Sequence, residues 1–495
     1  MLIYHDSRNG DYRMPYGAVT VGTAVMIRVK VEDAKPSDVY LRTWIDGEGE
    51  RLLPMKVSET DGNIYEVTLT RESPCILWYC FKINFNDGSV RYYGAQGGHT
   101  GGEGCMYESE PPSFQITVYK ERKVPDWYKN GIIYQIFPDR FKRGDDYVSN
   151  AALDLSMHKN GPRRVLIEDW NEPVDYKKDE KGRIVEWGFY GGTLRGIIKR
   201  LPYLKEFGVT AIYLNPIVES ASNHRYDTGD YMTVSPLLGG DEAFKELCDK
   251  AREAGIRVIL DGVYNHTGAD SMYFNKYGNY DTVGAFGNPE SPYRDWYYFK
   301  DDSYDGYESW WGVGDLPTLN KDNKEYRKLI RESMTKFMKL GASGFRLDVA
   351  DELSDDFIED IKRNVTDELG DDGIVIGEVW EDASNKISYG VLRKYFLGTE
   401  LDAVMNYPYR DGIIAFLTGK ISAYNLAQTV QSLKENYPTE AFYGNFNMLG
   451  SHDRIRILTA LGDAPEEGTL SAVLRRDYRL DEGKKDLAIK RLWLA

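Results

Sequence analysis

Three short sequences each place a carboxylic acid at the end of an expected β-strand. They are GFRLDV (344–349), IGEVW (376–380) and LGSHD (449–453), and their acids are Asp348, Glu378 and Asp453. In a barrel of alternating strands and helices, residues at the carboxyl ends of the strands converge on one mouth. Three acids at that mouth can supply a nucleophile, a proton donor and an orienting acid, which cleavage of a glycosidic bond requires.

Arg346 precedes Asp348 by two residues. Side chains repeat every two residues along a strand, so both should point into the barrel. A guanidinium beside Asp348 favours the ionised carboxylate and should lower its pKa, as a nucleophile requires. Glu378 must instead keep its proton, and crowding by Asp348 and Asp453 should raise its pKa.

Further polar residues lie near these strand ends. The sequence DGVYNH (261–266) closes an earlier apolar run, and His452 comes directly before Asp453. Imidazole, amide and carboxylate groups there can hydrogen-bond sugar hydroxyls. The candidates are Asp261, Asn265, His266 and His452. None of the six histidines has metal-ligand spacing with another, so zinc is not expected.

Each of these features has a simpler interpretation when it is taken alone. An acid at a strand end is more often a helix cap or a surface residue. Arg346 and Asp348 can form a structural ion pair, and His266 can be a buried structural histidine. Trp380 can simply pack, and the Trp310–Trp311 pair fits sugar stacking and core filling equally well. The whole set, in order on successive strands, favours catalysis.

The elements that must position these residues alternate between strands and helices from about residue 131. Repeated units of this kind predict parallel strands, and seven of them favour a barrel over an open sheet. The expected strands are 132–137, 209–214, 257–263, 344–349, 374–379, 401–406 and 446–451. Helical runs between them are expected at 193–206, 241–254, 324–340 and 354–369.

The residues before the barrel have a different pattern. Val25, Ile27, Val29 and Val31 alternate with polar residues, as in a half-buried strand, and Asp-Gly turns separate similar runs. We therefore expect an N-terminal β-sandwich over 1–122 and a catalytic barrel over 123–495. Residues 267–322 are too long for a plain connection and predict a small inserted domain over the mouth.

Composition excludes several classes of partner. The net charge of the 495-residue chain is −16, with 78 acidic against 62 basic residues. This balance argues against a nucleic-acid or anionic-membrane surface, and no apolar run is long enough to span a membrane. The chain begins without a secretory signal pattern, and its four cysteines have no metal spacing. A cytoplasmic location with reduced cysteines is expected.

With these motifs in place, the chain resembles the α-amylase superfamily of retaining glycoside hydrolases. It is most similar to the neopullulanase, cyclomaltodextrinase and maltogenic amylase group, over essentially its whole length. The four blocks that carry the resemblance are DGVYNH (261–266), GFRLDVADE (344–352), IGEVWED (376–382) and NMLGSHD (447–453). Two further blocks are HRYDTGDY (224–231) and DLPTLN (315–320), and HDSRNGDYRMPYGA (5–18) resembles the group's N-terminal starch-binding-type module.

The resemblance implies a role for each matching residue. Asp348 would be the nucleophile, Glu378 the acid/base and Asp453 the transition-state stabiliser. Arg346, His266 and His452 would hold the sugar at the cleavage point, and Tyr226 would stack on it. Trp380 matches the group's usual residue after the acid/base, and 267–322 would be the family's domain B.

The resemblance also implies an activity and its alternatives. We expect a retaining hydrolase of α-1,4 bonds in maltooligosaccharides, cyclodextrins or pullulan, with α-1,6 cleavage also open. A transglycosylase, a debranching enzyme, or a sugar-binding or transporter-associated homologue without catalysis are the alternatives. In this group the N-terminal module often completes a partner's active site, so the resemblance also implies a possible homodimer.

Two departures from the family pattern concern cofactors and the chain end. The family's calcium ligands are replaced here by Arg143-Gly144-Asp145 and Gly191-Gly192-Thr193. A hard cation needs several oxygen ligands, so no cofactor is expected to be required and calcium is doubtful.

No eighth strand is expected after the seventh, only helices at about 468–477 and 482–495. The expected fold is therefore an α/β (β/α)8 TIM barrel that lacks its eighth strand, as in a truncated fragment.

Overall fold

The computed structural model describes residues 1–97, 101–300, 305–463 and 478–495. The chain forms two compact units. The first unit contains Met1–Lys123, Val379–Leu449 and Leu487–Ala495, and the second contains Val124–Glu378 and Gly450–Asp486. The domain boundaries expected from the sequence, after 122 and around 267–322, stay predictions.

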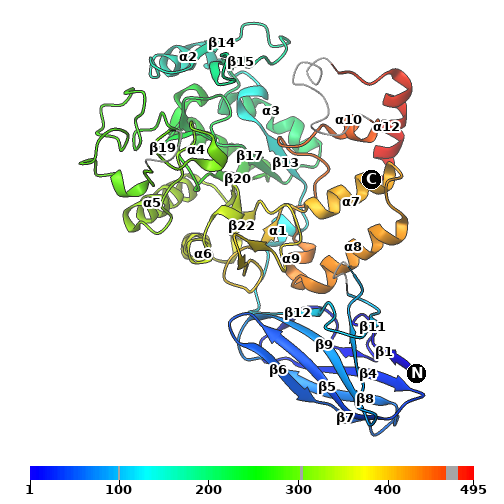
Figure 1. The fold of residues 1–495 in the computed structure, drawn as a ribbon. Coiled ribbons are helices and arrows are strands. Elements are labelled where there is room, and N and C mark those ends of the chain that lie inside the picture. The colour runs from blue at the N-terminus through cyan, green and yellow to red at the C-terminus, as the bar shows by residue number, and fades with distance from the viewer. Residues whose placement is uncertain (98–100, 301–304, 464–477) are drawn as a thin grey trace. The chain divides into compact units, whose positions relative to one another are not determined.

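Two sheets make up the N-terminal part of the first unit (Figure 1). One contains β1 (Leu2–Tyr4), β2 (Arg13–Met14), β4 (Ala24–Glu32), β7 (Lys56–Val57) and β8 (Ile64–Thr70). The other contains β3 (Val19–Thr20), β5 (Pro36–Ile45), β6 (Gly49–Pro54), β9 (Cys75–Phe85), β10 (Val90–Gly94), β11 (Cys105–Tyr107) and β12 (Phe114–Tyr119). Nearly all neighbouring strands are antiparallel, and β12 with β3 is parallel.

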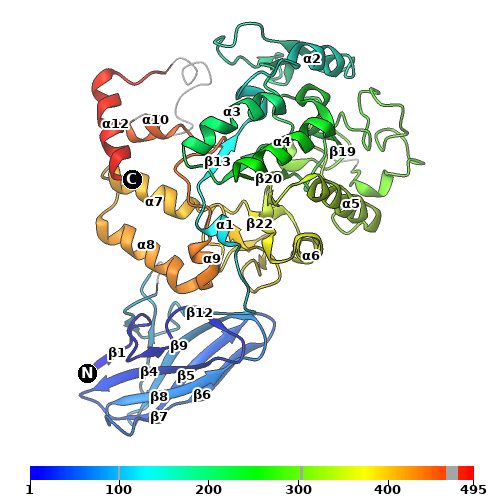
Figure 2. The same cartoon turned by 180° about the vertical axis from the view of Figure 1, so that it is seen from behind.

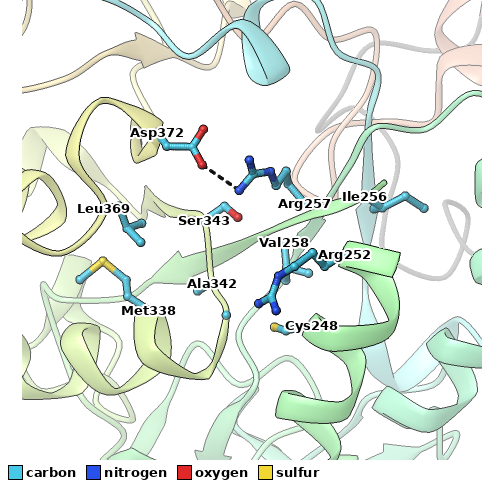
Figure 3. Close-up of a pocket in the computed structure, with 11 residues that line it drawn as sticks. Cys248, Arg252, Ile256, Arg257, Val258, Met338, Ala342, Ser343, Leu369 and Asp372 are labelled. Atoms are coloured by element: carbon cyan, nitrogen blue, oxygen red, sulfur yellow. Dashed lines mark ion pairs between the residues drawn. The ribbon is translucent and has the colours of Figure 1, made fainter. Parts of the chain in front are cut away.

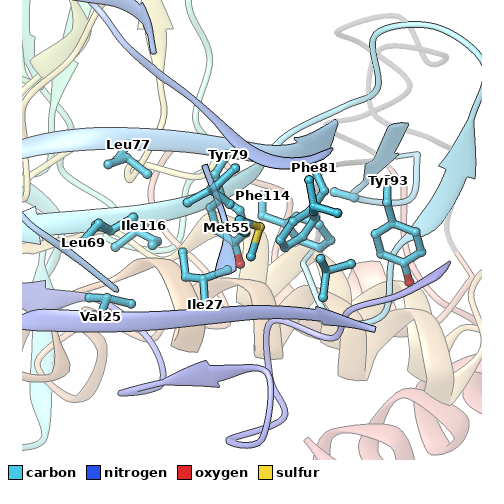
Figure 4. Packing of buried hydrophobic residues seen from close by; sticks show 14 of the residues in the cluster. Val25, Ile27, Met55, Leu69, Leu77, Tyr79, Phe81, Tyr93, Phe114 and Ile116 are labelled. Atoms are coloured by element: carbon cyan, nitrogen blue, oxygen red, sulfur yellow. The ribbon is translucent and has the colours of Figure 1, made fainter. Parts of the chain in front are cut away.

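One hydrophobic core lies between these sheets (Figure 4). Val25 and Ile27 of β4 are at most 1% exposed, as the alternating pattern of that strand predicts. They share this core with Leu77, Tyr79 and Phe81 of β9. The N-terminal sheets therefore bury apolar surface of their own.

The rest of the first unit is mainly helical. It contains β23 (Ile387–Ser388), β24 (Val391–Leu392), β25 (Ala403–Val404), α7 (Tyr407–Leu417), α8 (Ala423–Asn436) and α9 (Thr439–Tyr443). Within this unit, Arg13 of β2 donates to Glu435 of α8 at 2.9 Å, and both side chains are at most 2% exposed. This buried ion pair joins the N-terminal sheets to α8.

A parallel sheet forms the centre of the second unit, in the order β13, β17, β20, β21, β22. Its strands are β13 (Ile133–Ile136), β17 (Ala211–Leu214), β20 (Arg257–Gly262), β21 (Gly344–Leu347) and β22 (Ile374–Gly377). The helices between them are α3 (Leu194–Glu206), α4 (Gly240–Ala254), α5 (Lys324–Leu340) and α6 (Asp355–Leu369), along one side of the sheet (Figure 2). These five strands and four helices confirm the predicted alternation within a few residues.

Smaller elements surround this sheet. They include α1 (Asp126–Lys129), α2 (Tyr147–Leu155), β14 (Arg163–Leu166), β15 (Lys177–Lys178), β16 (Ile184–Phe189), β18 (Val218–Ser220), β19 (Thr228–Val234) and α10 (Ile457–Leu461). The described part of 267–322 contains the short 3-10 turns Arg294–Trp296 and Trp310–Gly312 and isolated β-bridges such as Phe299 to Tyr307. Within the described segments, every helix is too short or too polar to span a lipid bilayer.

Two predictions for the C-terminal part are wrong or only partly correct. The strand expected at 401–406 is reduced to β25, and the one expected at 446–451 does not form, because only Phe446 makes a single bridge, to Met405. Asn447 and Gly450 interrupt the apolar run, and such residues favour turns over strands. Asp453 therefore lies in a turn rather than at a strand end. The helix α12 (Glu482–Leu494) is present as expected, while 468–477 lies outside the described residues.

Candidate active site

Arg346 lies at the centre of a cluster of acids in the second unit. Its Nη1 is 2.8 Å from Asp348 Oδ1 and 2.8 Å from Asp261 Oδ1, and its Nη2 is 3.0 Å from Glu378 Oε2. The Arg346 side chain is fully buried. One guanidinium thus brings together carboxylates from the ends of three neighbouring strands, β20, β21 and β22.

The backbone at these strand ends fixes the acids. The amide of Asp348 donates to Gly262 O, and the amide of Glu378 donates to Leu347 O, so the parallel ladder continues to both acids. Val349 has a left-handed backbone with φ of 41°, and its amide donates to Glu378 Oε2 at 2.8 Å. A β-branched residue is strained in that conformation. The strain is stored next to the two carboxylates that the sequence assigns to catalysis.

Asp261 accepts from three side chains. The hydroxyls of Tyr213 and Tyr226 donate to its Oδ2 at 2.6 and 2.7 Å, while Arg346 occupies its Oδ1. A carboxylate with this many donors has little capacity left for a substrate. The arrangement indicates that Asp261 orients Arg346 and Tyr226.

His452 and Asp453 reach the same cluster from the turn after residue 450. The ring of His452 stacks on Tyr226 with centroids 5.3 Å apart and planes 9° apart. His452 Nε2 lies 2.7 Å from the Tyr226 hydroxyl and 3.3 Å from Asp453 Oδ2. The side chain of Asp453 is 34% exposed, so this acid faces solvent more than Asp348 or Glu378.

Burial is the largest influence on the pKa values of Asp348, Asp453 and His452. It raises the pKa of Asp348 well above the usual range, and the charges of Glu378 and Asp261 add to the rise against the pull of Arg346. Arg346 acts on the pKa of Asp348 in the expected direction, but burial and the two neighbouring acids outweigh it. Burial and the charge of Glu378 also raise the pKa of Asp453 to about 6, and burial lowers the pKa of His452 to about 4.

Asn265 and His266 follow β20 and contact the inserted segment. Lys321 Nζ donates to Asn265 Oδ1 at 2.8 Å, and the His266 ring stacks on Trp310 with centroids 5.4 Å apart. His266 is 1% exposed, and burial lowers the pKa of this histidine to about 3. Its ring has polar contacts with the Asn265 side chain, at 3.3 Å from Nδ1, and with the Tyr226 backbone.

Trp380 belongs to the first compact unit, unlike the other candidates. Its ring stacks on Tyr407 with centroids 4.6 Å apart, and the residue is 41% exposed. This contact accounts for one face of the indole by packing. Its role in substrate binding stays a prediction.

Sequence reasoning missed three residues that contact the cluster. Tyr213 lies in β17 and donates to Asp261, Asn215 follows β17 and donates to Tyr226, and Gln135 of β13 contacts His452. A signal was available, because Gln135 and Asn215 are polar residues near the carboxyl ends of apolar strands.

The residues at the family's calcium position do not suit a cation. The Arg143 guanidinium donates to the carbonyls of Tyr190 and Glu168 at 2.7 and 3.0 Å. The Thr193 hydroxyl accepts from the amides of Gly144 and Gly196 and donates to Asp146. A cationic side chain already uses the backbone oxygens there, so calcium does not fit this place.

A cavity of about 130 Å³ lies at the opposite ends of the strands (Figure 3). Its lining includes Arg257 and Val258, where β20 begins, and Ser343, just before β21. The acids follow the other ends of these strands. This cavity is therefore not part of the candidate active site.

Comparison with known proteins identifies the family of this chain. The alpha amylase, catalytic domain family matches residues 135–475, which is more than half of the chain. An amylopullulanase of Thermoanaerobacter thermohydrosulfuricus is 35% identical over 99% of this chain and 35% of its own length. Neopullulanase 2 of Thermoactinomyces vulgaris is 31% identical over 96% of this chain and 75% of its own length.

Solved structures similar to this chain belong to the same group of enzymes as these relatives. The type III pullulan hydrolase from Thermococcus kodakarensis has a TM-score of 0.60 at 26% identity, covering 100% of this chain and 78% of that one. The chain spans only 26% to 38% of the length of three amylopullulanases among its relatives. The family and these neighbours imply a (β/α)8 barrel for the catalytic part. The acid cluster at the carboxyl ends of parallel strands, within the matched residues, therefore belongs to a member of the alpha-amylase catalytic-domain family.

Proposed function

We propose that this chain hydrolyses α-glucans with retention of anomeric configuration. The observation that carries the proposal is the contact of one guanidinium, Arg346, with both Asp348 and Glu378. It places the two carboxyl groups side by side. In retaining glycosidases they lie about 5–5.5 Å apart, whereas inverting enzymes separate them by about 6.5–9.5 Å to admit a water.

The retaining reaction assigns a step to each acid. Asp348 attacks the anomeric carbon and forms a glycosyl ester, while Glu378 gives its proton to the leaving oxygen. Glu378 then takes a proton from water, which attacks the anomeric carbon and releases Asp348. His452 would hold the sugar, and Asp453 would stabilise the positive charge that develops on it.

The electrostatics of the cluster favour one retained proton, and the raised pKa of Asp348 lets that acid compete for it before substrate binds. Four carboxyl groups, those of Asp261, Asp348, Glu378 and Asp453, act on one another and on the single guanidinium of Arg346. Mutual repulsion favours retention of at least one proton at neutral pH. The mechanism needs that proton on Glu378, and ionised Asp348 is then stabilised by Arg346.

The substrate class follows from the relatives. Their names include amylopullulanase, neopullulanase and cyclomaltodextrinase. For this chain we infer α-1,4 cleavage in maltooligosaccharides, cyclodextrins or pullulan, with α-1,6 cleavage as a second activity. Residues 1–122 would form a starch-binding-type module, supported by their own core, and 267–322 would form domain B. A cytoplasmic location and a homodimer belong to the same proposal.

Product analysis tests the proposal. The protein is incubated with β-cyclodextrin, pullulan and starch, and the first products are followed by chromatography and proton NMR. We expect short maltooligosaccharides that appear first as the α anomer, and several orders of magnitude less turnover for Asp348→Asn. An initial β anomer, or an Asp348→Asn variant that keeps a tenth of the activity, would contradict it. Products longer than the substrate would instead identify a transglycosylase.

A further inference from the structure

The hydroxyl of Tyr226 has three close polar neighbours. They are Asn215 Nδ2 at 2.8 Å, Asp261 Oδ2 at 2.7 Å and His452 Nε2 at 2.7 Å. A phenol carries one proton, and an ionised carboxylate only accepts. The Tyr226 proton therefore goes to Asp261, whose other oxygen is ion-paired with Arg346. Asn215 and His452 must both donate to Tyr226, so Nε2 of His452 carries a proton.

The other nitrogen of His452 faces Gln135. Gln135 Nε2 lies 2.8 Å from His452 Nδ1 and 3.1 Å from Asn215 Oδ1. Asn215 must present its oxygen to Gln135, because its nitrogen donates to Tyr226. The two protons of the Gln135 amide then serve Asn215 and His452. If the amide were rotated, its oxygen would face the Asn215 oxygen, and two acceptors would be left without a proton between them.

The surroundings keep the imidazole of His452 neutral. Burial is the main cause that lowers the pKa of His452 to about 4, and the charge of Arg346 acts in the same direction. Asp261 and Glu378 act against it, Asp453 is 3.3 Å from Nε2, and His224 is a further titratable neighbour. A neutral ring has one protonated nitrogen, and the donor count assigns that proton to Nε2.

We propose that Gln135, held by Asn215, is a positioning residue that fixes His452 as the neutral Nε2–H tautomer. In this tautomer, Nε2–H is a donor toward Tyr226 and Asp453. In the other, a bare nitrogen would face the carboxylate of Asp453, and the two would repel. Gln135 thereby acts on catalysis only through His452 and Asp453, and this consequence rests on the proposed function.

Nitrogen NMR of the protein labelled with 15N-histidine tests the tautomer directly. The chain has only six histidines, and His452 is identified by the signal lost in His452→Gln. At neutral pH the wild type should show a protonated Nε2 and an unprotonated Nδ1 at His452. Gln135→Glu places an acceptor against Nδ1, so the proton should move to Nδ1 and the pKa of His452 should rise by about one unit or more.

A second variant and a control separate this effect from misfolding. Gln135→Met removes the donor at similar length and should leave a mixture of both tautomers. Gln431→Glu makes the same chemical change at an exposed position of α8 and should leave His452 unchanged. Unchanged signals from the other histidines show that a variant is folded.

Three results would overturn the proposal. The first is a wild-type His452 with its proton on Nδ1, and the second is a folded Gln135→Glu variant with the same tautomer and pKa as the wild type. For catalysis, we expect kcat of both Gln135 variants to fall about tenfold or more with KM little changed. The third is an unchanged kcat in a variant whose tautomer has switched. An inactive wild type with the expected tautomer would instead contradict the proposed function.

Discussion

His158 forms a buried charged bridge whose loss should open one local region of the second unit. Its Nδ1 is 2.7 Å from Asp270 Oδ2 and its Nε2 is 2.5 Å from Glu219 Oε1, with all three side chains at most 6% exposed. Tyr280 donates to the second oxygen of Glu219 at 2.6 Å. The bridge joins the segment after α2 to β18 and to the start of 267–322.

The pKa of His158 sets how much the bridge stabilises the fold. Burial alone would lower the pKa of His158, but the hydrogen bonds to Asp270 and Glu219 outweigh it and raise the pKa from 6.5 to about 9. At 1.36 kcal/mol per unit, this rise corresponds to roughly 3 kcal/mol of stabilisation. A raised pKa stabilises the fold fully below the unfolded value and loses this contribution as the pH rises through the folded value. The stabilisation should therefore be complete below about pH 6.5 and disappear through about pH 9.

His158→Gln tests this bridge, because it removes the charge and leaves two buried carboxylates without a cation. Amide hydrogen exchange is the suitable assay, since a chain with two compact units need not unfold in one step. At about pH 6.5 we expect peptides from 269–280 to lose roughly 100-fold in protection, with β4 and β9 unchanged. After correction for intrinsic exchange rates, the difference in protection between the variant and the wild type should become smaller above about pH 9.

His5→Gln is the matched control. His5 is also fully buried and bonded through both nitrogens, to Arg28 O and the Tyr79 hydroxyl, but burial lowers the pKa of this histidine to about 3. It is neutral throughout the tested range, so its substitution should leave 269–280 protected. Equal protection of wild type and His158→Gln at about pH 6.5, or a gap that persists unchanged above about pH 9, would refute the reasoning.

Two further predictions concern the proton donor and calcium. If Glu378 is the general acid, the Glu378→Gln variant should lose much of its rate on maltotriose. It should lose far less on an aryl glycoside, whose leaving group needs no proton. Equal losses on both substrates would show that Glu378 is not the general acid. Because the Arg143 guanidinium and the Thr193 hydroxyl already have partners at the family's calcium position, chelation and dialysis should leave activity and Tm nearly unchanged. A fall in Tm that calcium reverses would disprove the second prediction.

The central sheet could be predicted because its strands are short, mainly apolar runs. All four residues of β17, β21 and β22 are buried, and such runs have one favourable environment, between the helices and the interior of the sheet. The 446–451 run could not be predicted in this way. Its conformation depends on pairing with a distant segment, and Asn447 and Gly450 weaken its own preference for a strand.

The sequence could predict which residues form the candidate site but not which of them contact one another. The spacing of Arg346 and Asp348 predicts their pairing, whereas the reach of the same guanidinium to Glu378 depends on the order of neighbouring strands. His158 had no signal in the sequence at all. Its two partners lie 61 and 112 residues away, and a lone histidine in a polar segment does not indicate a buried ionic bridge.

The direct test of the central claim is identification of the residue that forms a covalent glycosyl intermediate. The wild-type protein is treated with a fluorinated α-glucosyl fluoride, which slows release of the sugar ester, and the labelled peptide is located by mass spectrometry. The account predicts one sugar attached to Asp348, with no label in Asp348→Asn. A label on another residue, or a protein that hydrolyses maltooligosaccharides without ever forming an ester, would contradict it.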